Sequence, residues 1–240
     1  MEHNVNSLIG YSIGAKDGVI GEVEEFFFED NTWEIRYLIV KTGRWLSGRK
    51  VLMPPSALIK GAWQNGLFPV SLTKEQVVDS PEIDTDKPVS RQQETELYGH
   101  YEWLNYWGSG FYTNGLHVKT PFPVIDRQVT RESDLNDEQA NDDLHLRSTD
   151  RVTGYHIHAT DGGIGHVNDF IIEDKNWHIK FIVVDTHNWF GGVKLLIPVN
   201  HVTKIDWLES GMYLDIPIAS VEKSKPFIET DYQHLQLLKP

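Results

Sequence analysis

The chain has 240 residues, which is long enough for one large domain or two small ones. Hydrophobic residues make up 40% and aromatic residues 11%, as is typical of a globular protein. The complete absence of cysteine excludes disulfides, thiolate metal sites and cysteine nucleophiles. A formal net charge of −13 disfavours non-specific binding to nucleic acid, so we expect no nucleic-acid partner.

The sequence carries no sign of a membrane-spanning or secretory segment. No run approaches about 18 consecutive apolar residues, the minimum for a transmembrane helix. The N-terminal residues MEHNVNSLIGYS contain neither a basic region nor an apolar core of the kind found in signal peptides. We therefore expect a cytoplasmic protein, with a place at the cytoplasmic face of a membrane as the alternative.

An internal repeat dominates the organisation of the chain. Residues 10–55 align without a gap to residues 154–199, with 21 identities over 46 positions. The offset of 144 residues continues to a matched pair of tryptophans, Trp63 and Trp207. This pattern indicates a tandem duplication of one small domain.

In chain order, the apolar spacing of the first copy predicts short strands separated by turns. The predicted strands are 12–15, 20–28, 33–41, 51–54 and 67–70, and the second copy repeats them. Short strands, tight turns and little helix predict an all-β protein made of two tandem small antiparallel β-barrels, in which closure removes exposed edges. We place the domains at 5–80 and 149–227, with a linker at 81–148 and a C-terminal tail at 228–240.

The repeated phrase DG-x-IG-x-V begins at Asp17 in one copy and at Asp161 in the other. We interpret it as a turn in which Asp accepts hydrogen bonds from its own downstream backbone and Gly supplies a positive φ. The second glycine, Gly21 or Gly165, suits a bulge or sharp bend just inside a strand. The phrase therefore indicates backbone geometry rather than a phosphate-binding loop.

The segment between the copies is acidic and contains a cluster of aromatic residues. Residues 79–150 contain 15 acidic and 6 basic residues, a net charge of −9. A short helix of roughly three turns is expected from about Arg91. The aromatic residues that follow include Trp103, Tyr106 and Trp107, and they predict either an arm folded back on a barrel or a surface that contacts a partner or a membrane.

Two further groups of residues are candidates for sites. Arg44, Trp45 and Arg49, in the loop TGRWLSGRK, combine basic and aromatic side chains that could contact a partner, with ordinary surface variation as the alternative.

The second group consists of histidines in the second copy. His156 and His158 lie two apart on one strand, and His166 lies across the hairpin, so the three could bind zinc or nickel. Exposed histidines without a metal are the alternative. Carboxylates near the hairpins, such as Glu24, Glu25 and Asp169, offer acid–base chemistry or simple turn contacts.

Both copies share Gly-Tyr-x-Ile, Asp-Gly-x-Ile-Gly-x-Val, a strand that follows a tryptophan, a Trp-x-x-Gly loop and a strand that ends in proline. With this set of motifs, both copies resemble the PRC-barrel domain. The family is similar to the cytoplasmic domain of the photosynthetic reaction-centre H subunit and to the C-terminal domain of ribosome maturation factors. The resemblance implies a small β-barrel used for protein contacts, and no site residue transfers position by position.

We therefore expect a non-enzymatic protein-binding or assembly module without a cofactor, whose partners are other proteins or a second copy of itself. One alternative is a peripheral membrane factor associated with photosynthetic or electron-transfer complexes. Another is a metal-binding sensor or enzyme that uses the histidines of the second copy.

Overall fold

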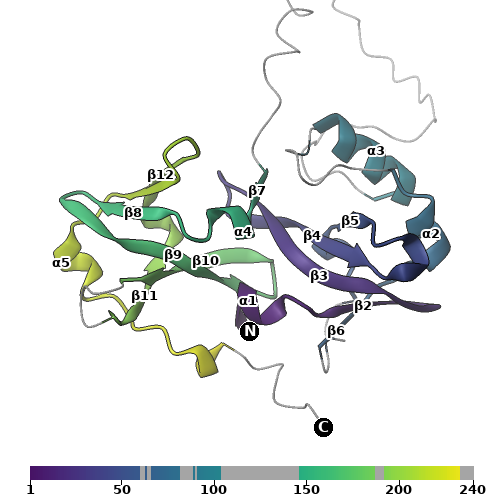
Figure 1. Ribbon diagram of the computed structural model, residues 1–240, viewed down its shortest axis with the longest axis horizontal. Helices are drawn as coiled ribbons and strands as arrows, with labels where there is room; N and C mark the ends of the chain where they lie inside the picture. The colour runs from purple at the N-terminus through teal and green to yellow at the C-terminus, as the bar shows by residue number, and fades with distance from the viewer. Residues whose placement is uncertain are drawn as a thin grey trace, which may run out of the picture.

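A computed structural model describes residues 1–59, 63, 66–81, 89, 91–103, 146–186 and 192–232. In this part of the chain the strands form one mixed sheet of 13 strands, whose main path runs β12-β13-β8-β9-β10-β4-β3-β2-β6 (Figure 1). The elements up to the inter-copy segment are β1 (Glu2–Asn4), α1 (Val5–Leu8), β2 (Ser12–Ala15), β3 (Gly18–Glu29), β4 (Glu34–Thr42), η1 (Arg44–Leu46), β5 (Lys50–Met53), η2 (Pro55–Ala57), β6 (Leu67–Pro69), α2 (Lys74–Val78) and α3 (Arg91–Tyr101). Those that follow are β7 (Leu146–Ser148), α4 (Thr149–Val152), β8 (His156–Ala159), β9 (Gly162–Glu173), β10 (His178–Asp185), β11 (Lys194–Pro198), η4 (Val199–His201), β12 (Val202–Asp206), β13 (Gly211–Leu214), α5 (Ile218–Val221) and η5 (Glu229–Asp231).

Each copy curls its strands into a small barrel, so the predicted all-β class is confirmed. In the first copy β2, β3, β4 and β5 pair antiparallel in succession, and a bridge between Leu58 and Val70 closes the barrel. The second copy repeats this with β8, β9, β10 and β11, and β11 continues through η4 into β12. Two strand pairs, β2 with β6 and β8 with β13, are parallel rather than antiparallel. The long connection between these strands leaves room for the crossover that a parallel pair needs.

The two copies exchange their first strands, which the repeat alone did not predict. β1 precedes the first barrel but pairs with β9 of the second, and β7 precedes the second barrel but pairs with β3 of the first (Figure 1). β1 and β7 are equivalent at the 144-residue offset, so the exchange is reciprocal. β1 lies before the predicted start of the first domain, and β7 lies inside the predicted linker.

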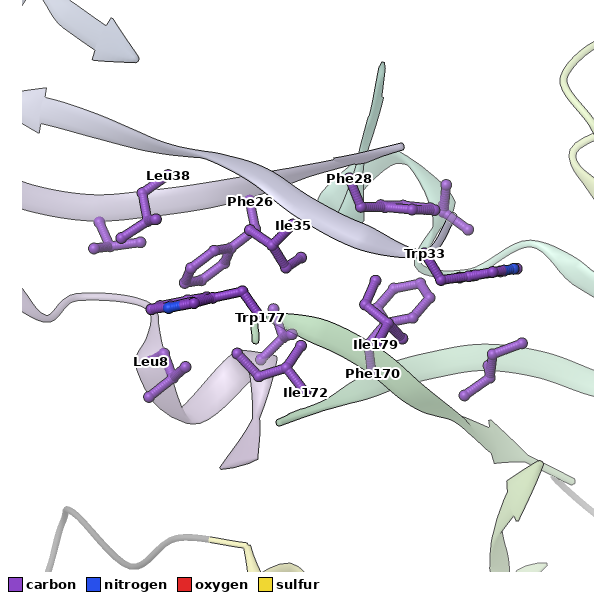
Figure 2. Close-up of a cluster of buried hydrophobic side chains, with 14 of the residues drawn as sticks. Leu8, Phe26, Phe28, Trp33, Ile35, Leu38, Phe170, Ile172, Trp177 and Ile179 are labelled. Carbon is purple, nitrogen blue, oxygen red and sulfur yellow. The ribbon is translucent and has the colours of Figure 1, made fainter. Parts of the chain in front are cut away.

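The cores of the two barrels meet in one continuous cluster of buried side chains. Trp33 and Trp177, at equivalent positions, both have a positive φ, 59° and 58°. The Ile35 N–H donates to the carbonyl of Trp177, and the Ile179 N–H donates to the carbonyl of Trp33, both at 2.8 Å. Figure 2 shows these residues packed between the two barrels. The ring centroids of Phe28 and Phe170 lie 5.8 Å apart.

The outer sheet face of each barrel is apolar and is covered by a different segment. On the first barrel Tyr37, Ile39 and Leu52 pack against α3, whose Leu97 is buried. The matching face of the second barrel packs against Tyr232, near the C-terminus. The 11-residue helix α3 confirms the helix predicted from about Arg91.

The repeated DG-x-IG phrase holds the start of a helix in each copy. The carboxylate of Asp17 accepts a hydrogen bond from the backbone N–H of Lys74 at 2.9 Å, and Asp161 accepts one from Ile218 at 2.8 Å. The expectation that these side chains bond their own turn was therefore wrong, because α2 and α5 present free N–H groups to them. The bulge expected at the second glycine is confirmed, because the strand register shifts next to Gly21 in the first copy and next to Gly165 in the second. The backbone also packs closely there, since a Cβ on Gly165 would lie 2.0 Å from the carbonyl oxygen of Asp185.

Candidate functional site

A groove of about 500 Å³ runs along the first barrel, between β3, the end of β4 and the residues that follow α1. Three large apolar side chains line it although they remain exposed to solvent: Ile9 at 38%, Val19 at 52% and Trp45 at 37%. Isolated exposed apolar residues are ordinary, but a group that lines one concave surface indicates a contact site.

Trp45 is held in a fixed orientation in this groove. It lies on η1, and its indole N–H donates to the carbonyl of Ile20 at 2.7 Å. The ammonium of Lys74 lies 5.2 Å from the centre of the indole ring, within the range of a cation–π contact. These contacts restrict the ring, so burying it against another molecule would cost less side-chain entropy than burying a freely rotating ring.

The basic residues predicted beside Trp45 have different roles. The Arg49 guanidinium donates to the backbone carbonyls of Ser80 and Pro81, at 2.6 and 2.7 Å. Arg49 therefore anchors the chain after α2 and is not directed at a partner. Arg44 is exposed at the start of η1. Lys50 forms an ion pair of 3.0 Å with Glu24.

The predicted aromatic arm folds back on the first barrel as far as Trp103. The Trp103 ring stacks on Tyr101 with 4.2 Å between centroids, and it lies edge-on to Tyr98 at 5.7 Å. Both rings pack against the apolar face that carries Tyr37. Tyr106 and Trp107, the other two residues predicted for this contact surface, lie outside the described residues.

The structure brings together two of the three histidines predicted as metal ligands. His156 and His166 are cross-strand partners on β8 and β9, with ring centroids 4.5 Å apart. His158 instead stacks on Tyr213, with 4.9 Å between centroids. Within the described residues, no group of three or more His, Asp or Glu side chains is placed to hold a metal ion together.

The carboxylates of Glu25 and Asp169 occupy equivalent positions where the exchanged strands meet the barrels. Asp169 accepts hydrogen bonds from the Asn4 side chain at 2.8 Å and from the Asn6 backbone at 3.1 Å. Its symmetric counterpart Glu25 accepts one from the Ser148 hydroxyl. Burial raises the pKa of both carboxyls, that of Asp169 to about 6. Both groups therefore lie at the contacts between one copy and the first strand of the other.

Sequence analysis missed Ile9 and Val19, the residues that make the groove apolar. The equivalent positions in the second copy are Thr153 and Gly163. The feature of the sequence that could have indicated these residues is this difference between the copies, with an apolar residue in the first and a small or polar residue in the second. This difference between the copies does not by itself indicate a site, because only the structure shows that Ile9 and Val19 face the same groove as Trp45.

The comparison with protein families agrees with this geometry. The model of the PRC-barrel domain matches residues 1–63 and 157–219. The chain belongs to the PRC-barrel family. The two matched regions each cover most of one of the barrels described above, so this PRC-barrel protein carries the domain twice.

A curated relative of this PRC-barrel protein is an uncharacterized protein of Deinococcus radiodurans. It is 31% identical over 97 residues, which cover 38% of this chain and 35% of that protein. The present chain therefore matches about a third of the relative's length.

Within the described residues, no helix is long and apolar enough to cross a membrane.

Proposed function

We propose that this protein is a non-enzymatic binding module that holds a segment of a partner protein in the groove of its first barrel. The observation that carries the proposal is the concave surface formed by Ile9, Val19 and Trp45, which is apolar, exposed and held in place by the barrel. Burial of such a surface by a partner lowers the free energy, because apolar area is removed from water.

The chemistry of the groove favours an extended segment with an apolar side chain flanked by basic residues. The apolar side chain would lie against Val19 and Trp45. Glu22, Glu24 and Lys41 also line the groove, so its lining carries one net negative charge, and the chain as a whole carries a net charge of −13. A basic partner would approach faster and be oriented by this charge.

The proposal is tested by affinity capture from native cells, followed by binding measurements on the purified partner. Val19→Asp places a charge in the groove at a side chain that is 52% exposed, so the barrel core is left intact. Leu208→Asp is the matched control, because Leu208 is 99% exposed and lies on the turn between β12 and β13 of the other barrel.

We expect one stoichiometric partner that binds the wild type and Leu208→Asp equally and binds Val19→Asp at least about tenfold more weakly. Titration calorimetry with the purified partner measures the change. A partner that binds Val19→Asp as tightly as the wild type would rule out the groove as its site. Failure to capture any stoichiometric partner would count against a binding module altogether.

A further inference from the structure

We propose that His156 and His166 form a two-imidazole site for a divalent transition-metal ion, with Zn²⁺ as the reference ion. The site lies on the second barrel and is independent of the groove on the first. Imidazole nitrogen is a preferred ligand for zinc and its neighbours in the first transition row.

The strand register places the two histidines directly opposite each other. His156 on β8 is the cross-strand partner of His166 on β9. The backbone N–H of His156 points away from β9 and donates to the carbonyl of Ser210 at 2.9 Å. The two residues are therefore a non-hydrogen-bonded pair, the arrangement in which opposing side chains approach most closely.

The separation of the rings suits chelation of a single ion. Their centroids are 4.5 Å apart and their planes are inclined by 48°, so the rings are not stacked and their nitrogens can converge. With Zn–N bonds of about 2.0–2.1 Å, two tetrahedral ligands hold their nitrogens about 3.3 Å apart, which small rotations of such rings can supply. His156 is exposed and His166 is half-buried, so an ion reaches the pair from solvent.

Further ligands would come from water or from another molecule. Asp185 on β10 is the register partner of His166, so a carboxylate follows the histidine pair across the sheet. Among the described residues, however, no three such side chains converge on one point. A metal ion held by this pair would keep open coordination positions, at which water or another molecule could bind.

The first barrel provides an internal comparison. It has Ser12 and Glu22 at the same paired positions and folds in the same way. The histidine pair is therefore not required by the barrel. His158, two residues along β8, is occupied by its stacking contact with Tyr213, so it serves as a control on the same strand.

The test is isothermal titration of the full-length, chelator-treated protein with Zn²⁺. His156→Gln and His166→Gln each remove one ligand, and His158→Gln removes the neighbouring imidazole. Nuclear magnetic resonance of the imidazole C–H groups shows which rings bind, and thermal unfolding without metal shows that each variant folds.

We expect the wild type to bind an ion that perturbs the His156 and His166 rings, with affinity lowered at least about tenfold in either pair variant and unchanged in His158→Gln. An absence of Zn²⁺ binding by the wild type would overturn the proposal. So would equal affinity in the pair variants, or an equal loss in His158→Gln. None of these outcomes bears on partner binding in the groove.

Discussion

Replacing Asp169 by asparagine should stabilise the protein at neutral pH and remove part of its pH dependence. The Asp169 side chain is almost fully buried, with 3% of the residue exposed, where β1 and α1 of the first copy meet β9 of the second. Burial is the largest influence on this carboxyl, and it raises the pKa to about 6 although Asn4, Asn6 and Phe170 donate hydrogen bonds to the carboxylate. Lys194 attracts its charge from β11, while Glu24, Glu25 and Asp150 line the same small cavity.

The direction of the pH dependence of stability follows from the raised pKa of Asp169. The folded protein binds the proton more tightly than the unfolded chain, in which the Asp169 carboxyl has its ordinary pKa of 3.8. The stabilisation by protonation is complete below that value and is lost as the pH rises through about 6. The difference between the two pKa values corresponds to about 3 kcal/mol of unfolding free energy above pH 7.

Asparagine keeps the shape of the side chain and cannot ionise. Its amide oxygen can accept from the backbone of Asn6 and Phe170, as the carboxylate does. Its NH₂ group needs an acceptor, and Asn4 can provide one by turning its amide over. Within the described residues the Asn4 Oδ1 atom is buried and has no hydrogen-bond donor. The turned amide of Asn4 then places its NH₂ group where the Oδ1 atom lay, so the number of buried polar groups without a partner does not rise.

Urea unfolding at two pH values measures the effect. Between about pH 4.5 and about pH 7.5, the unfolding free energy of Asp169→Asn should gain about 2 kcal/mol relative to the wild type. Glu222→Gln, at an exposed carboxyl, should change it by less than about 0.5 kcal/mol at both pH values. A constant difference between Asp169→Asn and the wild type across this range would refute the reasoning, because it would mean that Asp169 titrates alike in the folded and unfolded states.

Three further substitutions test the fold. Trp177→Ala should lower the unfolding free energy by about 3–5 kcal/mol, because the side chain is buried between the barrels; a loss below about 1 kcal/mol in urea unfolding would contradict this packing. Gly165→Ala should lower the melting temperature far more than its control Gly163→Ala, whose added Cβ would meet its nearest atom at 3.9 Å; equal shifts in calorimetry would argue against the close backbone approach. Asp17→Ala should cost about 0.5–2 kcal/mol through the lost hydrogen bond to the start of α2, and hydrogen exchange at Lys74 should become faster; unchanged exchange there would show that Asp17 does not hold the helix.

The candidate sites were partly predictable. Sequence analysis identified Trp45, because an aromatic residue among basic ones stands out in a loop. It also identified His156 and His166, because a hairpin places residues on facing strands side by side. It assigned Arg49 to a partner, whereas the structure uses Arg49 to bind the carbonyls of Ser80 and Pro81. The direction of a long side chain depends on the acceptors that surround it, and these come from distant parts of the chain.

The sequence by itself determined the duplication, the strand pattern and the helix near Arg91. These features depend on local periodicity and on the repeat at a fixed offset, both of which can be read along the chain. Only the tertiary structure decided that β1 and β7 exchange barrels. The two barrels offer the same register and a similar contact at the joint, Asn4 with Asp169 and Ser148 with Glu25. A strand that fits two equivalent edges carries no local information about which one it joins, so the three-dimensional path of the chain makes that choice.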